Sequence, residues 1–501
     1  MPSVAVPEIR VARVNRAEIE PAGDYVLYWM IAARRTSWNF GLDHAVARAR
    51  ELKKPLAVFE ALRCGYRWAS DRLHRFALQG MQSQQAAWVE APLIYYPYVE
   101  PRLDAARGLI AALAERACLV VTDEFPCFFL PAMVAHVGRQ LPVRLEQVDS
   151  NGLLPLRAAD RVFPTAYAFR RFLQQNLAPH LEQMPLADPL AGLSVKPAAG
   201  LIDDVRERWP AASAELLSGT REALGELPID HTVGAAAFDG GEEVARRKLE
   251  RFLSSKLARY AEDRNVPDLD ASSGFSPYLH WGHLSVYEAF HELARREDWK
   301  PSKLAKKASG SREGWWGMSP AAEAFLDELI TWREVGYNLC SRRRDYDAYG
   351  SLPEWAQETL AEHRRDHRPA LYTLEQFERS QTHDPLWNAA QRQLVQEGRL
   401  HNYLRMLWGK KILEWSPTPQ SALATMIELN NKYAVDGRNP NSYSGIFWVL
   451  GRYDRPWGPE RPIYGKIRYM TSENTARKVA VKEYLERHGP ATSRSLWGDD
   501  E

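Results

Sequence analysis

The stretch Tyr25-Val26-Leu27-Tyr28-Trp29-Met30 is an uninterrupted apolar run of strand length near the start of the chain. Similar short runs follow it at intervals, and helical patterns separate them. The runs cover residues 55–59, 93–96, 118–121 and 143–148, and the helix candidates between them include 42–54 and 103–116. Short apolar strands that alternate with helices are typical of a parallel sheet covered by helices. We therefore predict an α/β N-terminal domain with a parallel sheet.

The composition changes after this predicted domain. From about residue 185 to residue 241 the chain is rich in Pro, Ala, Gly and acidic residues, which is typical of a long connector with one or two helices. Beyond it helical patterns dominate and no strand rhythm returns. We predict an α/β domain at 1–185, a linker at 186–241 and an all-α domain at 242–501. No Gly-x-Gly-x-x-Gly motif follows the first strand, so a dinucleotide site of the Rossmann type is not indicated.

The composition as a whole excludes several classes of protein. A net charge of +1 over 501 residues gives no overall attraction to polyanions, so any nucleic-acid contact needs a local basic face. The four scattered cysteines include no Cys-x-x-Cys pair, which argues against a disulfide framework, a zinc ribbon or an iron–sulfur cluster. No apolar run is long enough to span a bilayer, and no secretory signal pattern is present. We expect a cytoplasmic monomer with no membrane partner.

Tryptophans are concentrated in the C-terminal half. Trp408 and Trp415 are seven residues apart in a helix-forming stretch, so they share one helix face at a rise of roughly 10 Å, a plausible distance for electron hopping. Large aromatic side chains at helical spacing also fill cores, and for any single ring that is the better interpretation. The case for electron transfer therefore depends on the combination of residues.

Six sequence motifs in the second half occur in an order that resembles the class II cyclobutane pyrimidine dimer photolyases, within the photolyase/cryptochrome family. They are residues 272–282 (SSGFSPYLHWG), 328–334 (ELITWRE), 382–387 (THDPLW), 401–406 (HNYLRM), 436–438 (DGR) and 465–470 (GKIRYM). The first half resembles the family more loosely, through Tyr28-Trp29-Met30 and Thr122-Asp123. The resemblance implies the photolyase/cryptochrome fold, with an all-α domain that binds FAD.

The residue types in these motifs suit a flavin dinucleotide. Serines at a turn that opens a helix are suited to a diphosphate, with Arg405 supplying charge, although Ser276 before Pro277 would also serve as an ordinary helix cap. The resemblance assigns Asp436 as the acceptor for the flavin N3–H and Asn430 as the amide near flavin N5. The implied cofactor-binding residues are Tyr260, Ser272, Ser273, Ser276, Asn402, Arg405, Asn430, Asp436 and Arg438.

A pocket for a flipped lesion needs a stacking wall and an acid. Glu328 and Trp332 are four residues apart, which places a carboxyl group and a flat ring on one helix face. The alternative is that Glu328 pairs with Arg333 on the surface and Trp332 lies in the core. With the resemblance, the catalytic residues are Glu328, Trp332, Trp448 as the second wall, and Asn430. Trp332, Trp448, Arg455, Lys466 and Arg468 are the predicted DNA-binding residues.

The resemblance also implies an electron chain that reduces the flavin after light absorption, formed by Trp387, Trp408 and Trp415, with Tyr372 as an outer donor. The sequence does not order the hops. Three features depart from the class II pattern: loop lengths after Trp448, which put the role of Arg455 in question, Asn402 in place of glycine, and Asn439 in place of the final acid of Asp-Gly-Arg-Asp.

No metal site is predicted. His363 and His367 are spaced by four residues, but the two arginines between them would repel a cation, and we interpret the run 362–368 as a solvated helix face.

The predicted function is therefore light-driven repair of cyclobutane pyrimidine dimers in UV-damaged DNA, by electron transfer from reduced FAD to a flipped dimer. An antenna chromophore, a deazaflavin or a folate, is expected in the α/β domain, although no motif identifies it. The alternatives are a cryptochrome-like blue-light photoreceptor, a (6-4) photoproduct repair enzyme using His401 and His280, and a flavoprotein oxidoreductase. The first usually carries a long variable tail, and the last needs a nicotinamide site that the sequence does not show.

Overall fold

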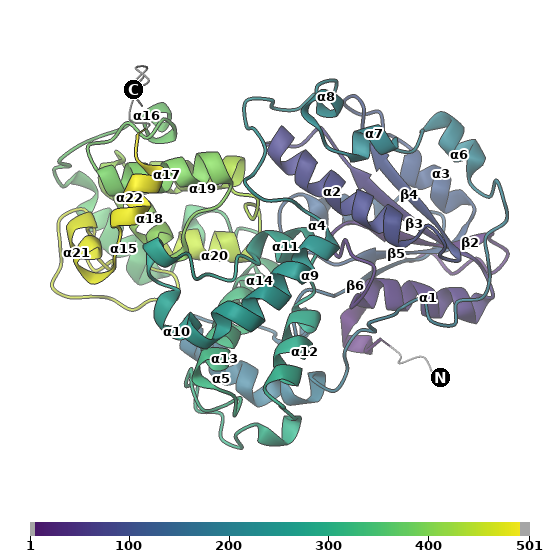
Figure 1. Ribbon diagram of the computed structural model, residues 1–501, viewed down its shortest axis with the longest axis horizontal. Coiled ribbons are helices and arrows are strands. Elements are labelled where there is room, and N and C mark those ends of the chain that lie inside the picture. Colours follow the sequence, from purple (N-terminus) through teal and green to yellow (C-terminus); the bar gives the residue numbers. More distant parts are fainter. Residues whose placement is uncertain (1–5, 491–501) are drawn as a thin grey trace, which may run out of the picture. The chain divides into compact units, whose positions relative to one another are not determined.

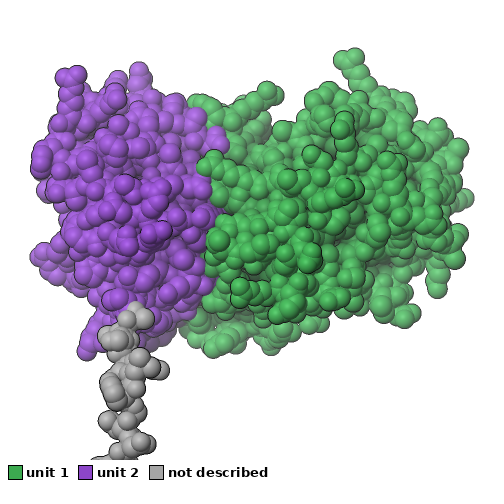
Figure 2. Space-filling view, turned by 90° about the horizontal axis from the view of Figure 1, so that it is seen from above, with its two compact units in different colours: residues 1–258, 273–346, 438–442 green, residues 259–272, 347–437, 443–501 purple. Residues whose placement is uncertain are grey.

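The computed structural model describes residues 6–490 and divides into two compact units (Figure 2). The first unit comprises the chain up to residue 258, with residues 273–346 and 438–442. The second comprises residues 259–272, 347–437 and the chain from 443 onward. Each unit therefore contains segments that are far apart in the sequence. The composition-based boundaries near residues 185 and 241 remain a prediction.

The first unit contains a six-stranded sheet in the order β1-β6-β5-β2-β3-β4, of which Figure 1 labels β2 to β6. Only the edge pair β1 and β6 is antiparallel, and the other neighbours are parallel. The strands are β1 Val11–Arg13, β2 Tyr25–Met30, β3 Leu56–Leu62, β4 Leu93–Val99, β5 Ala117–Asp123 and β6 Leu145–Val148. The predicted parallel sheet is thus confirmed, and β1 is a short strand that the apolar pattern did not indicate.

The sheet is covered on both faces, which explains why its strands are continuously apolar. Every residue of β2 and of β5 is buried. Because side chains alternate between faces, Tyr25, Leu27 and Trp29 join a core cluster with α3 (Leu109–Glu115), α4 (Leu130–Gly138) and α6 (Asp203–Arg208). Tyr28 instead points toward the start of α1 (Phe40–Leu52). A second cluster packs α2 (Asp71–Ala87) against α7 (Ala214–Leu217) and α8 (Arg221–Leu224).

The helices of the first unit pack on this sheet or follow it in the chain. They are α1 Phe40–Leu52, α2 Asp71–Ala87, α3 Leu109–Glu115, α4 Leu130–Gly138, α5 Ala166–Asn176, α6 Asp203–Arg208, α7 Ala214–Leu217, α8 Arg221–Leu224, α9 Glu242–Arg251, α11 Ser276–Trp281, α12 Val286–Arg296, α13 Pro320–Leu326 and α14 Arg333–Arg342. The helix expected over 103–116 is shorter than predicted, because Asp104 and Gly108 have positive φ and break its first half.

The predicted connector contains three short helices, α6, α7 and α8, rather than one or two. Its large apolar side chains are buried or partly buried. Ile202, Val205 and Trp209 belong to the core cluster beside the sheet, so this segment is part of the packing of the first unit.

In the second unit the described elements are helical apart from one isolated bridge between Arg461 and Gly465. The helices are α10 Tyr260–Asp263, α15 Glu354–Glu362, α16 Leu374–Glu378, α17 Pro385–Glu397, α18 Asn402–Trp415, α19 Pro419–Tyr433, α21 Ser472–Lys478 and α22 Lys482–His488, with most of α20 Pro440–Val449. The prediction that no strand rhythm returns is confirmed for the described residues. Within residues 6–490, no helix combines the length and the apolar character required to cross a bilayer.

Candidate functional site

Arg405 and Asp436, two of the predicted cofactor residues, lie together in the second unit. A nitrogen of the Arg405 guanidinium is 3.5 Å from Asp436 Oδ2. The other carboxylate oxygen, Asp436 Oδ1, and the Arg405 Nε are buried without a hydrogen-bond partner among the described residues. Buried polar groups of folded proteins are normally paired, so this acceptor and this donor fit a ligand that carries both an N–H group and an anionic group.

The turn that holds Asp436 depends on the next residue. A Cβ atom at Gly437 would lie 2.8 Å from the Asn430 carbonyl oxygen and 3.0 Å from that of Ala434, so only glycine allows this close approach. Asn430 is itself buried at the end of α19, where its side-chain amide donates to Asn431 Oδ1 at 3.2 Å. The Asp-Gly pair is therefore a packed structural feature, not an isolated surface turn.

Tyr260, Asn402 and His401 differ in their environments. Tyr260 begins α10 and is buried, with the guanidinium of Arg264 5.5 Å from its ring centroid. Asn402 is exposed as the first residue of α18. The preceding His401 is buried, and burial lowers its pKa to about 4. His401 is therefore neutral near pH 7 and is not suited to act as a general acid.

The serine motif forms a different helix start from the one considered in the sequence. Ser276 is the first residue of α11, and the N-cap position is occupied by Phe275, with no capping hydrogen bond from its side chain. The interpretation of Ser276 as an ordinary helix cap is thus wrong, because the Phe275 carbonyl oxygen already accepts from the Leu279 backbone N–H at 2.9 Å and the helix begins one residue earlier. Ser272 and Ser273 are half-buried in the turn before it.

Arg438 and Asn439 belong to the first unit. Arg438 is buried with a φ of 61°, and its carbonyl oxygen accepts from Cys127 Sγ at 3.1 Å. The Asn439 side-chain amide is 3.0 Å from His280 Nδ1. Burial, with Arg438 nearby, lowers the pKa of His280 well below its usual value. His280 is therefore a neutral, partly buried side chain, so neither histidine of the (6-4) hypothesis is an imidazolium that could act as a general acid near pH 7.

Glu328 and Trp332 lie in a π-helical turn, Asp327–Trp332, between α13 and α14, where the sequence predicted ordinary α-helix. Such turns are rare and are frequent at functional sites. Both side chains are partly exposed, whereas the three residues between them, Leu329–Thr331, are buried. The two predicted side chains are therefore partly accessible, whereas the residues between them are not.

The neighbours of this turn decide between the two interpretations of the motif. Asp327 is fixed by Arg170 through two hydrogen bonds of 2.7 and 3.0 Å. Arg333 is buried and donates to the Asn151 carbonyl oxygen at 2.6 Å and to the Tyr337 hydroxyl at 3.0 Å. The alternative of a surface pair between Glu328 and Arg333, with Trp332 in the core, is therefore wrong.

The predicted DNA-binding cations of the second unit surround a tryptophan that the sequence analysis missed. The guanidinium groups of Arg455 and Arg468 each lie 5.1 Å from the Trp457 ring centroid. The Trp457 indole N–H donates to Asp454 Oδ1 at 2.9 Å. Arg455, Lys466 and Arg468 are exposed, and Lys466 is 3.2 Å from Glu460. The alternation of aromatic and basic residues over 453–469 was the available signal in the sequence for this cluster.

Trp448, the predicted second stacking wall, is partly exposed on α20.

The three tryptophans of the predicted electron chain are among the most buried side chains of the protein. Asp384 caps α17 by accepting from the backbone N–H of Trp387 at 3.0 Å, and Pro385 occupies the first helical position. The Trp387 indole N–H then donates to the Trp408 carbonyl oxygen at 3.0 Å, and its ring centroid is 6.0 Å from that of Trp415. The THDPLW motif thus places Trp387 in contact with both of the other tryptophans.

Two further rings extend this series. Tyr372 has its ring centroid 5.6 Å from that of Trp415, and His383 is 5.0 Å from the same ring. The contacts therefore run Trp408, Trp387, Trp415, Tyr372, an order that the sequence did not give. His383 was quoted within its motif but was not predicted as a site residue.

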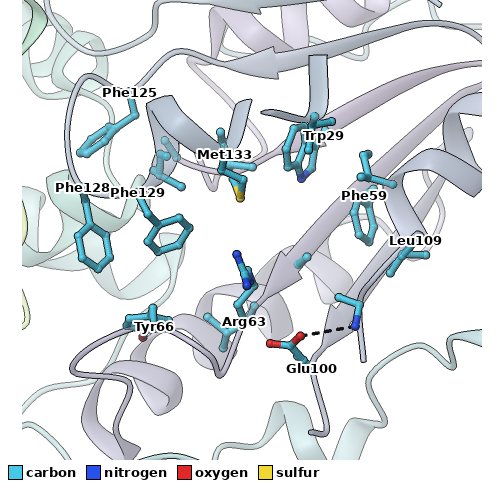
Figure 3. Close-up of a pocket in the computed structure, with 18 of the residues that line it drawn as sticks. Trp29, Phe59, Arg63, Tyr66, Glu100, Leu109, Phe125, Phe128, Phe129 and Met133 are labelled. Carbon is cyan, nitrogen blue, oxygen red and sulfur yellow. Dashed lines mark hydrogen bonds between the residues drawn. The ribbon is translucent and has the colours of Figure 1, made fainter. Parts of the chain in front are cut away.

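The first unit contains a cavity of about 340 Å³ at the carboxyl ends of its parallel strands, where open α/β sheets commonly bind ligands. Trp29, Phe59 and Phe129 line it, and Figure 3 shows the Arg63 guanidinium directed into it. The Arg63 guanidinium is 5.9 Å from the Phe129 ring centroid. Arg438 and His280 also line the cavity. The aromatic residues at the ends of β2 and β3 were a sequence signal for this site.

The histidine run differs from its predicted structure. α15 ends at Glu362, and His363–Arg365 form a 3-10 turn, so His363 and His367 do not face one another on a helix. His363 instead lies with its Nδ1 2.6 Å from Asp366 Oδ2. Within residues 6–490, no group of three His, Cys, Asp or Glu side chains is arranged to hold a metal ion.

The curated proteins and the solved structure that resemble this chain carry the same kind of name. No protein-family model matches the chain. Curated relatives named deoxyribodipyrimidine photo-lyase come from Methanothermobacter thermautotrophicus (32% identical, covering 95% of this chain and 97% of the relative), Oryza sativa subsp. japonica (34%, 95% and 89%) and Potorous tridactylus (31%, 93% and 81%). A bacterial class III photolyase from Agrobacterium tumefaciens has a similar fold, with a TM-score of 0.64 at 18% identity over 93% of this chain and 86% of that one. The predicted photolyase/cryptochrome fold is confirmed.

Proposed function

Because this chain belongs to the deoxyribodipyrimidine photo-lyase family, we propose that it uses blue or near-ultraviolet light to split cyclobutane pyrimidine dimers in damaged DNA. The observation that carries the proposal is identity above 30% over more than nine tenths of the chain to relatives of that name. The six motifs that resemble class II members supply the residues. The enzyme is a lyase, since the reaction breaks carbon–carbon bonds with no net redox change.

The residues assigned to FAD match its hydrogen-bonding groups. Asp436 Oδ1 is a buried acceptor for the flavin N3–H, and Arg405 Nε is a buried donor for an anionic part of the cofactor. Asn430 offers an amide to flavin N5. Tyr260, Ser272, Ser273, Ser276, Asn402 and Arg438 complete the proposed set. When bound, reduced FAD supplies the electron that starts the splitting of the dimer.

Glu328 is proposed as the acid that hydrogen-bonds the flipped dimer and stabilises the negative charge that develops on it. Trp332 and Trp448 provide flat faces against which the dimer stacks. The accessibility of Glu328 and Trp332, on one side of a turn whose other residues are buried, supports these roles. Arg455 and Arg468 are proposed to bind DNA phosphates beside Trp457, with Lys466 contributing less because Glu460 compensates its charge.

Trp408, Trp387 and Trp415 are proposed to pass electrons inward to the flavin, which keeps the cofactor reduced. The ring separation of 6.0 Å between Trp387 and Trp415 supports this role, as does the hydrogen bond from Trp387 to the backbone of Trp408. Tyr372 is the outermost donor in this proposal.

The cavity of the first unit is proposed as the site of an antenna chromophore. A space of about 340 Å³ lined by aromatic rings and reached by Arg63 suits a planar, electron-rich ligand of the deazaflavin or folate type. Ala61→Trp would fill part of the cavity. The variant should lose the extra absorption band of protein loaded with either chromophore, whereas an undiminished band would contradict this assignment.

The deciding experiment uses an oligonucleotide with one thymine dimer, incubated with chemically reduced protein in blue light and in the dark, and analysed by liquid chromatography. Light-dependent return of two thymines supports repair. If the protein carries a flavin spectrum and the dimer survives illumination, the photoreceptor alternative replaces the repair function.

A further inference from the structure

Tyr372 is positioned as the outer end of the tryptophan series by two contacts with Trp415. Its backbone N–H donates to the Trp415 carbonyl oxygen at 3.2 Å, which fixes the chain at the end of α18. Its ring is 5.6 Å from the Trp415 ring at an interplanar angle of 79°. The side chain is partly exposed, whereas Trp415 is buried. Tyr372 thus joins the buried tryptophans to the surface.

The phenol of Tyr372 makes two hydrogen bonds to a single residue. Its oxygen is 2.6 Å from the ring nitrogen His383 Nδ1 and accepts from the backbone N–H of His383 at 3.0 Å. The two rings are also stacked, with centroids 6.0 Å apart. The short bond therefore belongs to a fixed local arrangement, because α16 and the loop after it bring His383 back beside Tyr372 and Trp415.

This arrangement favours the phenol as the donor of the short hydrogen bond. The phenol oxygen already accepts from the His383 backbone, and within residues 6–490 its hydrogen has no other protein acceptor. We therefore assign the hydroxyl as the donor to Nδ1, which corresponds to the imidazole tautomer with its hydrogen on Nε2. Because His383 is exposed, its far side is accessible to water. The pair provides an acceptor for the phenolic proton and an outlet to solvent.

We propose that His383 accepts the phenolic proton of Tyr372 when Tyr372 donates an electron to oxidised Trp415. This inference rests on the proposed function, in which light-driven electron transfer toward the flavin oxidises Trp415. One electron passes from Tyr372 to the Trp415 radical cation, which becomes neutral tryptophan. The phenolic O–H bond breaks, and its proton forms a bond to His383 Nδ1. The products are a neutral tyrosyl radical and an imidazolium, so charge and atoms balance.

The proton transfer makes the electron transfer from Tyr372 more favourable. A phenol that has lost an electron is a strong acid, so retaining its proton would make the electron transfer uphill and reversible. A base already within hydrogen-bond distance removes this obstacle, and general bases in such positions typically accelerate reactions by about 10²- to 10⁴-fold. Loss of the proton also hinders return of the electron from Trp415. His383 thus makes Tyr372 an effective final donor.

The test is time-resolved absorption of the protein with oxidised FAD after a laser flash. The wild type should form a tryptophan radical that decays as a neutral tyrosyl radical appears, and deuterated water should slow that step. His383→Phe keeps a ring against Trp415 but removes the acceptor, and it should slow tyrosyl formation about 100-fold. Tyr372→Phe should leave a long-lived tryptophan radical.

A second variant guards against a packing defect in His383→Phe. In His383→Ala, added imidazole should restore tyrosyl formation in proportion to its concentration, because the position is exposed. Nitrogen NMR of histidine-labelled protein gives a readout that needs no light: His383 should show hydrogen on Nε2, and Tyr372→Phe should shift its Nδ1 resonance.

The outcomes separate this inference from the proposed function. Tyrosyl formation at the wild-type rate in His383→Phe, or no rescue by imidazole, would overturn it. So would a wild type that forms the tryptophan radical but no tyrosyl radical. Absence of any tryptophan radical would instead contradict the electron chain. Repair of a thymine dimer by chemically reduced wild-type protein tests the proposed function independently, because that reaction bypasses the tyrosine.

Discussion

Trp387 and Trp415 meet edge to face, with ring centroids 6.0 Å apart and an interplanar angle of 70°. Both side chains are almost completely buried. Edge-to-face packing is a normal stabilising arrangement of aromatic rings, so the contact contributes to the core of the second unit as well as to the proposed electron path. Core packing and electron transfer are therefore compatible roles for these tryptophans. Kinetic measurements on variants can test the second role.

Replacing Trp415 by phenylalanine should interrupt light-driven reduction of the flavin. Phenylalanine retains an apolar ring but is much harder to oxidise, so loss of the oxidised-flavin absorption under blue light with an external reductant should slow strongly. Trp209→Phe is the matched control, because Trp209 is a buried tryptophan of the core beside the sheet in the first unit. Equal slowing in both variants would indicate general destabilisation instead.

Glu328→Gln should reduce repair without removing a hydrogen-bonding side chain. Loss of one group that stabilises developing charge typically lowers a rate by about 10²- to 10³-fold. Repair per absorbed photon should therefore fall by about 10²-fold, the lower end of that range. The measurement is thymine recovered from a dimer-containing oligonucleotide at limiting light. Glu362→Gln, on the exposed last turn of α15, serves as control. Full repair by Glu328→Gln would remove Glu328 from the proposed mechanism.

Arg468→Ala should weaken binding of dimer-containing duplex DNA and reduce the salt dependence of binding. Removal of a single phosphate-binding cation lowers the slope of log affinity against log salt by about one. Lys466→Ala should have a smaller effect, since Lys466 is 3.2 Å from Glu460. Fluorescence anisotropy at several salt concentrations measures both, and Arg455→Ala tests whether the altered loop after Trp448 still binds DNA. An unchanged slope in Arg468→Ala would exclude a phosphate contact there.

Lys410 should make the stability of the protein depend on pH. It is fully buried on α18, where its ammonium group donates to the Val449 carbonyl oxygen. Burial lowers the pKa of Lys410 to about 7, while Asp454 raises it and Arg468 lowers it further. An unfolded lysine titrates near about pH 10.4, so between these values the unfolded chain binds more protons, and the free energy of unfolding rises with pH.

The expected rise is about 2 kcal/mol between about pH 7 and pH 9. Lys410→Met, which keeps the length of the side chain, should remove this part of the pH dependence. Urea unfolding followed by tryptophan fluorescence at several pH values provides the measurement. Identical pH profiles for the variant and the wild type would show that Lys410 keeps its proton in the folded protein.

The sequence by itself determined much of the local structure, though not all of it. Tyr25–Met30 forms a strand because six consecutive apolar residues cannot face water on either side, and the structure confirms its limits. Asp384 followed by Pro385 defines the start of α17, because a carboxylate cap and a residue of fixed φ act on adjacent backbone groups. The ordered motifs of the second half also identified the family.

Only the tertiary structure decided how separate segments meet. The contacts of Trp387 with Trp415 and of Tyr372 with Trp415 join different helices and loops, and no periodicity specifies the distance between two helices. The π turn at Asp327–Trp332 inserts a residue that helical spacing does not reveal. The hydrogen bond from Tyr372 to His383 likewise depends on a loop conformation. Apolar patterns describe which side of an element is buried, whereas packing across elements determines what each buried side chain contacts.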